Sequence, residues 1–439
     1  MQIYVFKEMS PERYDVMKHR SSRSILNDDV FDEVKVIADE VIKNGDQAVI
    51  DNTIKFDNVR LTLDSLLVSE KEFEEAWAHT PAKIKSAIQV AIENAAKYNN
   101  CIKPPEIETH TISDGVLAGR KTSPLSRVAL YVPCGKGSYP SSFITTAVPA
   151  VVAGVREIVA IVPPKEDGSI DAAILVAAKM LGISTVYRGN GVSVVFAAAF
   201  GTALLPKVEK IIGPGGEYVM AAQMYAQLKG VSVGLFYGPS ECMIIADDTA
   251  DPVLIAADLI NEAEHGFNSS AILITDSPVI AQEVQALVGQ QLPRLPGRRR
   301  KYAESALTLY GGIVIVGNME EAVSLANDWG NEHIQIATKN PWDIAKQING
   351  ASELLIGQHT TFSAISYVIG VPACLPTGHF AKIYAGVTVD TFLKVSAITE
   401  LDVQGLQSLA EPIKTLSQYE GFPGHTNSIV IRQERNIIG

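Results

Sequence analysis

The sequence predicts an α/β fold with two successive, doubly wound, Rossmann-like domains, an N-terminal helical segment and a small C-terminal arm. Three observations support this prediction. The chain has 439 residues, which is too long for one compact domain, and 47% of them are hydrophobic, enough to bury large cores. From Val128 onward, short apolar runs alternate with amphipathic helical stretches in regular order. That alternation is typical of parallel βαβ units.

The first part of the chain, residues 1–127, is expected to be mainly helical. Between Asp28 and Asn99 apolar and charged residues recur with a helical period, and the pattern breaks near residues 57–62 and at Thr80-Pro81. We expect this segment to pack partly on the second α/β domain.

The first α/β domain is expected at residues 128–237 and the second at residues 238–376. In the first, predicted strands at 127–133, 157–163, 184–188 and 210–214 alternate with helices at 142–155, 170–181 and 191–201. In the second, strands at 242–246, 271–275, 312–316, 333–338 and 353–357 alternate with helices at 252–265, 278–291, 319–328 and 341–348. Two such domains in succession predict a cleft for a cofactor and a substrate. Residues 377–439 are expected to form the arm.

Composition limits the possible partners. A formal net charge of −12 argues against a nucleic acid or an anionic membrane, since each binds a basic surface. The four cysteines lie far apart, which favours a reducing cytoplasm over a disulfide framework. The charged N-terminus has no apolar signal core, and no apolar window is long enough to span a bilayer. We therefore expect a cytoplasmic protein that acts on a small molecule.

A carboxylate and an imidazole, Glu332 and His333, stand side by side where a predicted helix gives way to a predicted strand. Such junctions face clefts in α/β folds, and this pair of groups commonly transfers protons near pH 7. An isolated Glu-His dipeptide is more often a solvated loop pair. The catalytic interpretation therefore depends on the other motifs of the chain.

Two glycine-rich turns follow predicted strands and precede predicted helices. They are residues 131–142 (YVPCGKGSYPSS) and Gly213-Pro214-Gly215-Gly216. Glycines allow the backbone to approach a ligand closely, and a helix N-terminus offers free N–H groups to a phosphate. Neither turn has the G-x-G-x-x-G spacing of a dinucleotide site, so a purely structural βα turn explains them equally well.

A second group of residues could bind a metal ion. Glu262 and His265 are three residues apart on one face of a predicted helix, which suits two ligands of one ion. The alternative is a capping histidine beside a solvated carboxylate. His425, in a late Gly/Pro-rich loop, is either a further ligand or an exposed histidine. Ser240 lies in a turn (Gly-Pro-Ser-Glu) of a kind that is more often structural than catalytic.

In their order along the chain, these motifs resemble the histidinol dehydrogenase family, and the resemblance covers nearly the whole sequence. The matching segments are YVPCGKGSYPSS, AVPAVVAGV, IIGPGGEYV, YGPSECMIIAD, DLINEAEHG, NDWGNEHIQI, LLIG, CLPTGHFA, DTFLK and EGFPGHTNS. The resemblance implies an NAD-dependent enzyme that oxidises a primary alcohol through the aldehyde to the carboxylate. It also implies a homodimer with exchanged segments, in which one site draws residues from both subunits.

The resemblance also implies roles for individual residues. His333 would take the proton as hydride leaves to NAD, and Glu332 would activate the water that attacks the aldehyde. Ser240 would contact the substrate and Tyr131 would lie beside the nucleotide. His265 and His425 match two histidine zinc ligands of the family, and Glu262 stands in place of its glutamine ligand.

The sequence departs from the family pattern at several positions. An aspartate zinc ligand falls on Ser366, and a substrate-contacting histidine falls on Ala373. Near the cofactor, an asparagine becomes Gly216 and a glutamine becomes Ser193. Glu262 restores the negative ligand that Ser366 removes, so a His-His-carboxylate zinc site and a site without metal both remain possible.

These departures lead us to expect a small primary alcohol other than histidinol as the substrate, oxidised through the bound aldehyde to the acid. A pocket that loses the polar partners of a ligand stops favouring that ligand, and this reasoning rests on Ser366 and Ala373. Two alternatives stay open: a two-electron dehydrogenase that releases the aldehyde, and a non-catalytic NAD-binding homologue. A covalent route would need one of Cys134, Cys242 or Cys374 in the cleft.

Overall fold

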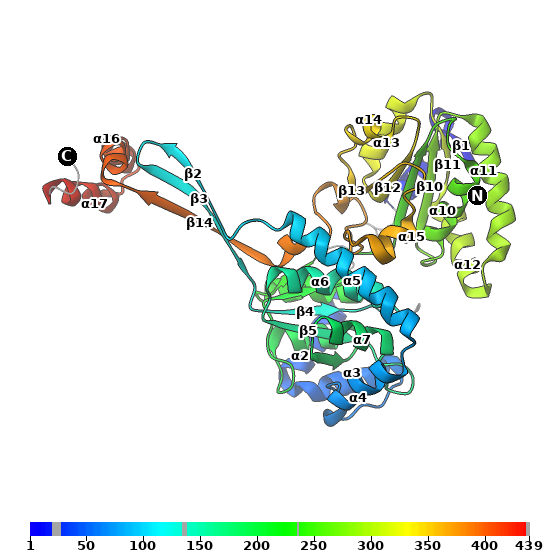
Figure 1. Ribbon diagram of the computed structural model, residues 1–439, viewed down its shortest axis with the longest axis horizontal. Helices are drawn as coiled ribbons and strands as arrows, with labels where there is room; N and C mark the ends of the chain where they lie inside the picture. The colour runs from blue at the N-terminus through cyan, green and yellow to red at the C-terminus, as the bar shows by residue number, and fades with distance from the viewer. Residues whose placement is uncertain (20–27, 134–137, 235–236, 436–439) are drawn as a thin grey trace. The chain divides into compact units, whose positions relative to one another are not determined.

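The computed structural model describes residues 1–19, 28–133, 138–234 and 237–435 (Figure 1). The chain divides into two compact units. Unit 1 comprises Met1–Ile102 and Leu125–Thr391, and unit 2 comprises Lys103–Pro124 and Phe392–Gly439. Unit 1 contains two parallel sheets, as expected from the alternating sequence pattern. Of the motifs in the sequence, Cys134 and the glycines at positions 135 and 137 lie outside the described residues.

The first sheet of unit 1 has five parallel strands in the order β6-β5-β4-β7-β8. Its strands are β4 (Arg127–Tyr131), β5 (Glu157–Val162), β6 (Thr185–Arg188), β7 (Lys210–Ile212) and β8 (Ser232–Val233). The helices that follow its strands are α6 (Pro140–Ala153), α7 (Ala172–Met180), α8 (Gly191–Phe200) and α9 (Glu217–Leu228). Helices cover both faces, which explains why the strands are almost entirely apolar.

The N-terminal helices pack mainly on this first sheet. They are α2 (Asp28–Asn44), α3 (Asp46–Asp57), α4 (Glu70–His79) and α5 (Ala82–Ile102). Helix α2 carries an apolar stripe at helical spacing, Val30, Val34, Ala38 and Val41, and these residues share one core with α8 and α9. Helices α2 to α5 are therefore an outer layer of the first domain.

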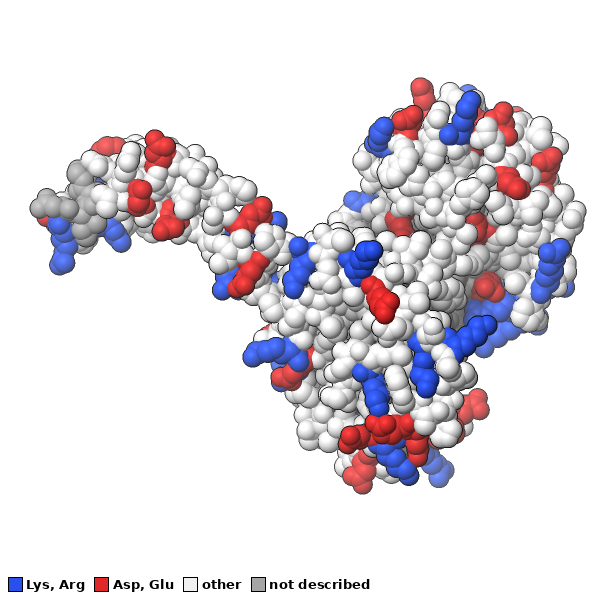
Figure 2. Space-filling model, viewed as in Figure 1, with Lys and Arg blue, Asp and Glu red and all other residues white. Residues whose placement is uncertain are grey.

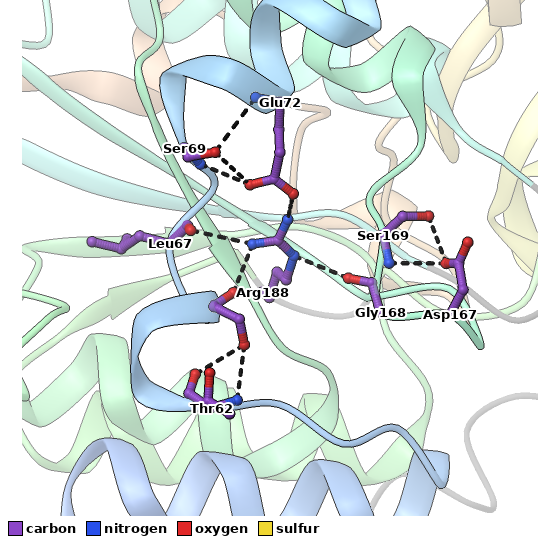
Figure 3. Close-up of polar contacts among 9 residues, drawn as sticks. Thr62, Leu67, Ser69, Glu72, Asp167, Gly168, Ser169 and Arg188 are labelled. Carbon is purple, nitrogen blue, oxygen red and sulfur yellow. Dashed lines mark hydrogen bonds and ion pairs between the residues drawn. The ribbon is translucent and has the colours of Figure 1, made fainter.

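Arg188 at the end of β6 fastens α4 and its preceding loop to this domain (Figure 3). The guanidinium is 3% exposed and donates to the carbonyl oxygens of Ser65, Leu67 and Gly168. It also forms an ion pair with Glu72, which closes a capping box with Ser69 at the start of α4. One buried cation thus joins three chain segments.

The second sheet has six parallel strands in the order β1-β11-β10-β9-β12-β13. Its strands are β1 (Ile3–Val5), β9 (Glu241–Ala246), β10 (Ser270–Thr275), β11 (Gly312–Ile315), β12 (Asn331–Ala337) and β13 (Ala351–Ile356). Its helices are α10 (Pro252–Ala263), α11 (Pro278–Gln291), α12 (Gly297–Ser305), α13 (Met319–Trp329) and α14 (Pro341–Ala345). Strand β1 pairs with β11, so the first residues of the chain complete this sheet. Helix α1 (Pro11–His19) adds Met17 to the same core.

After β13 the chain returns toward the first domain. Helix α15 (Phe362–Ala364) packs against α10, and the π-helical turn η5 (Ile365–Ile369) packs against α5. There the Asn94 side-chain amide donates to the carbonyl of Val368 at 2.7 Å. Asn99 on the same helix accepts from the backbone N–H of Val389 at 2.8 Å. Helix α5 therefore connects the first domain with the segment that follows the second sheet.

Unit 2 is a three-stranded antiparallel sheet with two helices. Strands β2 (Ile107–Ser113), β3 (Val116–Pro124) and β14 (Leu393–Leu401) pair in the order β14-β3-β2, followed by α16 (Val403–Tyr419) and α17 (Pro423–Glu434). This corrects the expectation of a helical segment up to residue 127, because residues 107–124 are strands. Strands β2 and β3 pair with each other, and β3 also pairs with β14, a partner remote in the sequence that a local pattern does not indicate.

The surface and the helices add two observations. On the face drawn in Figure 2, Lys and Arg side chains are interspersed with Asp and Glu and do not form one continuous basic surface. In the described part of the chain, no helix combines the length and the apolar character that a membrane crossing requires.

Candidate active site

Glu332 and His333 lie at the beginning of β12. Helix α13 ends at Trp329, and Gly330 turns the chain with a φ of +63°, a conformation that favours glycine. Both side chains are buried, with 6% and 7% exposure, so they are not a solvated loop pair. They occupy the amino edge of the second sheet, although ligands of open α/β sheets commonly bind at the carboxyl edge.

His333 is held by three neighbours. Its Nδ1 lies 2.7 Å from Oε2 of Glu353 on β13, and its Nε2 lies 3.7 Å from Oε1 of Glu332. The ring of Phe362 meets the imidazole edge-on, with ring centres 5.8 Å apart and an angle of 84° between the planes. The imidazole therefore has a defined orientation between two carboxylates.

Glu332 is anchored from the neighbouring strand. Its Oε2 accepts the backbone N–H of Glu241 at 2.9 Å, and the Glu241 carboxylate accepts the N–H of Gly378 at 3.1 Å. The hydroxyl of Thr377 accepts the N–H of Gly238 at 2.9 Å. These bonds tie the Gly-Pro-Ser-Glu turn to the Leu-Pro-Thr-Gly-His loop, and they place half-buried Ser240 directly beside the anchor of Glu332.

Burial and charge shift the proton affinities of this pair. Burial raises the pKa of Glu332 to about 8, partly offset by the positive His333 and by the N–H of Glu241. Burial opposes the charged form of His333, but the carboxylates of Glu332, Glu353 and Glu262 outweigh it and raise its pKa to about 9. Two groups with shifted pKa values in one buried cluster are typical of a catalytic centre.

Glu262 and His265 lie at the end of α10, which runs back from β9 to the same edge of the sheet. Glu262 is 2% exposed and accepts from the side-chain amide of Asn261 at 2.9 Å, and Ser363 donates to that amide group at 2.8 Å. The Nδ1 atom of His265 lies 3.6 Å from the Glu262 carboxylate. These two residues offer one carboxylate and one imidazole to a cation.

The other residues predicted to bind the metal or the substrate lie outside the cluster of Glu332, His333 and Glu262. Ser366 is half-buried on η5 in unit 1, and Ala373 is half-buried in the segment that follows. His425 lies in the first turn of α17 and belongs to unit 2. Over the described ranges, no three His, Cys, Asp or Glu side chains gather closely enough to hold a metal ion. Glu262 and His265 alone are an incomplete zinc site, because zinc takes at least three protein ligands.

The cofactor residues lie at the carboxyl edge of the first sheet. The hydroxyl of Tyr131, the last residue of β4, donates to Oδ1 of Asn190 at 2.8 Å and accepts the N–H of Gly191 at 3.2 Å, at the start of α8. Ser193 is buried in the first turn of α8, and its hydroxyl has no hydrogen-bond partner among the described residues. Gly216 caps α9, and a Cβ atom there would meet open space. An unpartnered hydroxyl and open helix N-termini fit a nucleotide.

The cysteines of the described chain do not support a covalent route. Cys242 and Cys374 are fully buried, and burial raises the pKa of each thiol, with nearby carboxylates adding to the effect. A nucleophilic cysteine needs a lowered pKa, so these two thiols are poor nucleophiles.

Sequence reasoning missed three residues of this site: Glu241, Glu353 and Thr377. Glu353 and Glu241 are single carboxylates in strands that are otherwise apolar, and a charge in a buried parallel strand is a recognisable signal. Their roles depend on which strands are neighbours, and the sequence alone does not reveal that.

The histidinol dehydrogenase family profile matches residues 20–433. The chain is 39% identical to the histidinol dehydrogenase of Synechocystis over 99% of both chains. It is 37% identical to a protein of Colwellia psychrerythraea named histidinol dehydrogenase homolog, covering 98% of this chain and 96% of that one. A crystal structure of histidinol dehydrogenase from Elizabethkingia anophelis has a TM-score of 0.93 and 31% identity, covering 99% and 98% of the two chains.

These comparisons correct one expectation. The prediction of a small alcohol other than histidinol is wrong in the light of full-length relatives named histidinol dehydrogenase. Changes at Ser366 and Ala373 alter two half-buried positions, whereas the buried carboxylates and the imidazole remain in place. The chain belongs to the histidinol dehydrogenase family of NAD-dependent oxidoreductases.

Proposed function

We propose that this chain oxidises histidinol with NAD in two steps, from the alcohol to the aldehyde and from the aldehyde to the carboxylate. The observation that carries this proposal is the buried Glu332–His333 pair, with Nε2 of His333 3.7 Å from the Glu332 carboxylate. The names of the full-length relatives support histidinol as the substrate.

In the first step, Nε2 of neutral His333 accepts the proton of the substrate hydroxyl. NAD, when bound, accepts the hydride from the carbinol carbon in each of the two oxidations. In the second step, Glu332 in its carboxylate form takes a proton from water as the water oxygen attacks the aldehyde carbon. The hydrate then loses a hydride and a proton, which leaves the carboxylate. The protons leave to solvent from His333 and Glu332.

The nucleotide would be held at the carboxyl edge of the first sheet. The Ser193 hydroxyl supplies a buried donor, and Gly216 leaves room above the N-terminus of α9. Tyr131 orders the first turn of α8 through Asn190 and Gly191. These features support NAD binding here.

A zinc ion would be held by Glu262, His265 and the partner subunit's His425. When bound, zinc would polarise an oxygen or nitrogen of the substrate as a Lewis acid. Glu262 is already buried and oriented by Asn261, as ligating carboxylates usually are. Ser366 is a weak ligand for zinc, so the negative charge of the site would come from Glu262. This arrangement requires the homodimer with exchanged arms that the family resemblance implies.

The arm itself gives a reason to expect that dimer. Leu416, Tyr419, Phe422 and Ile431 on its helices are more than two-fifths exposed, and Tyr419 is 90% exposed. Exposed apolar residues gathered on one small unit commonly mark an interface. A cytoplasmic location stays a prediction from the separated cysteines.

The decisive experiment measures NADH formation from histidinol by the purified protein. The His333→Gln variant, which lacks the base of the first step, is the control for contaminating activity. We expect two NADH molecules per histidinol, loss of activity after removal of metal by a chelator, and recovery when zinc is added back. Binding of NAD without any oxidation of histidinol would refute the proposal. Activity that is indifferent to the chelator would refute the zinc site alone.

A further inference from the structure

Glu353 is a buried carboxylate that no motif in the sequence singled out. It lies on β13 in register with His333 on β12, so the two side chains leave neighbouring strands at the same level. The side chain of Glu353 is 11% exposed, and its Oε2 lies 2.7 Å from Nδ1 of His333. A carboxylate in a parallel strand is costly to bury without a partner, and the imidazole is that partner.

This contact decides which ring nitrogen carries the proton. An ionised carboxylate only accepts hydrogen bonds, so Nδ1 of His333 must donate to Glu353. In the neutral ring the lone pair is then on Nε2, the atom that faces Glu332 at 3.7 Å. The opposite tautomer would place two acceptors, Nδ1 and the Glu353 oxygen, 2.7 Å apart.

The ring also cannot turn freely. Phe362 contacts it edge-on from α15, with 5.8 Å between the ring centres. The charged groups that face His333 come from three elements: Glu332 on its own strand, Glu353 on β13 and Glu262 on α10. Of these, Glu353 is the one within hydrogen-bond distance.

We propose that Glu353 is a positioning residue that fixes the Nδ1–H tautomer of His333 and thereby makes Nε2 the base for the substrate hydroxyl. The inference rests on the proposed function for its catalytic consequence. When Nε2 accepts the hydroxyl proton, the ring becomes an imidazolium with both nitrogens protonated. Glu353 then balances its positive charge until the Nε2 proton leaves to solvent, while the hydride goes to NAD. Such a carboxylate–histidine arrangement is a known way to orient an imidazole.

Two substitutions separate the charge of Glu353 from its hydrogen bond. Glu353→Gln keeps a hydrogen-bond acceptor and removes the negative charge. Glu353→Leu removes both the acceptor and the charge, and its side chain has a similar size. Glu320→Gln is the matched control, because it removes one negative charge from the exposed face of α13 in the same domain. Each variant must melt cooperatively and bind NAD before its rates are compared.

The first readout does not depend on activity. Protein labelled with ¹⁵N-histidine, with His333 assigned through His333→Gln, reports the tautomer of the ring by NMR at a pH above about 9, where the ring is neutral. We expect the Nδ1–H form in the natural protein and in the Glu320 control. In Glu353→Leu we expect a mixture or the Nε2–H form. An unchanged tautomer in Glu353→Leu would overturn the proposal.

The second readout is the pH profile of kcat for histidinol oxidation. We expect Glu353→Leu to lower kcat on the order of 10²-fold. In Glu353→Gln the rising limb should move to lower pH, because the ring loses a carboxylate that favours its protonated form. A purely structural role would lower kcat without moving the rising limb of the pH profile. If neither kcat nor the position of this limb changed, the catalytic consequence of the proposal would be overturned. If the natural protein does not oxidise histidinol, the proposed function fails, and the tautomer measurement still decides the role of Glu353.

Discussion

The chemistry of this chain depends on single residues that share one imidazole. Glu332 and Glu353 approach opposite nitrogens of His333, at 3.7 Å and 2.7 Å, and all three side chains are largely buried. The two carboxylates differ in their other contacts. Glu353 binds the ring, whereas Glu332 is anchored by the N–H of Glu241. One can therefore orient the base while the other acts on water.

The first prediction concerns the pH dependence of activity. The pKa of Glu332 is raised to about 8 and that of His333 to about 9. In the proposed reaction both residues act as bases, so their active forms accumulate as the pH rises. We expect kcat/KM to increase from pH 6 toward about pH 9. Initial rates of NADH formation across this range test the prediction, and a rate already at its plateau near pH 6 would contradict it.

The same shifts predict how stability depends on pH. Both groups have a higher pKa in the folded protein than their ordinary values of 4.5 for Glu332 and 6.5 for His333. The folded state therefore holds more protons, and the stabilisation is complete below the unfolded pKa values and disappears as the pH rises through about 8 to 9. Urea unfolding at pH 6 and pH 9 should show this loss, and Glu332→Gln should reduce it.

The Glu332→Gln substitution separates the two oxidations. The amide is nearly isosteric and still accepts the N–H of Glu241, but it cannot take a proton from water. We expect the aldehyde-to-acid step to slow by roughly 10²-fold or more, with a smaller effect on the first step. Single-turnover measurements started from histidinol and from histidinal compare the two steps. Equal losses in both would contradict the division of roles between Glu332 and His333.

At the scale of elements, strong local patterns were sufficient to predict most of unit 1. Helix α11 was predicted with both of its ends, and β4, β5 and β9 were predicted to within two residues, because apolar runs and capping residues are local signals. Strands β2 and β3 were missed although they pair with each other locally; only the pairing of β3 with β14 is remote in the sequence. Glu332 and His333 were predicted because they form a local motif. Glu353 was not predicted, because its role follows from the register between β12 and β13.

Arg188 provides a test of how α4 is attached to the first domain. Arg188→Met keeps an apolar stem but leaves the carbonyls of Ser65, Leu67 and Gly168 without their donor and Glu72 without its cation. Breaking a buried ion pair costs roughly 3–5 kcal/mol, and partial exposure of Glu72 moves the expectation to the lower end, about 3 kcal/mol. Urea unfolding measures the loss.

The matched control is Arg156→Met, an exposed arginine of the same domain whose side chain contacts Ser126. Surface substitutions of this kind usually change stability by less than about 0.5 kcal/mol. If both variants lose the same stability, the Arg188 network does not fasten α4 to the sheet.

At the scale of the whole molecule, the described residues of unit 1 do not make a complete metal site by themselves. Glu262 is on α10, His265 follows the end of that helix, and His425 is on α17 of unit 2. Motif order predicted these three residues because the motifs are short and local. No sequence pattern indicates which copy of the chain supplies His425, because that depends on how two subunits assemble. A subunit-mixing experiment can answer this question directly.

The last prediction uses two variants that we expect to be inactive, His333→Gln and His425→Ala, which damage unit 1 and unit 2 respectively. If the arms are exchanged, a mixed dimer contains one site with both defects and one site with none. Random mixing makes half of the dimers mixed, so we expect about a quarter of the natural activity to return. Refolding the two variants together and measuring histidinol oxidation tests this. A mixture of His333→Gln with His265→Ala is the control: both changes lie in unit 1, so every site keeps a defect. Recovery in neither mixture would show that each subunit completes its own site.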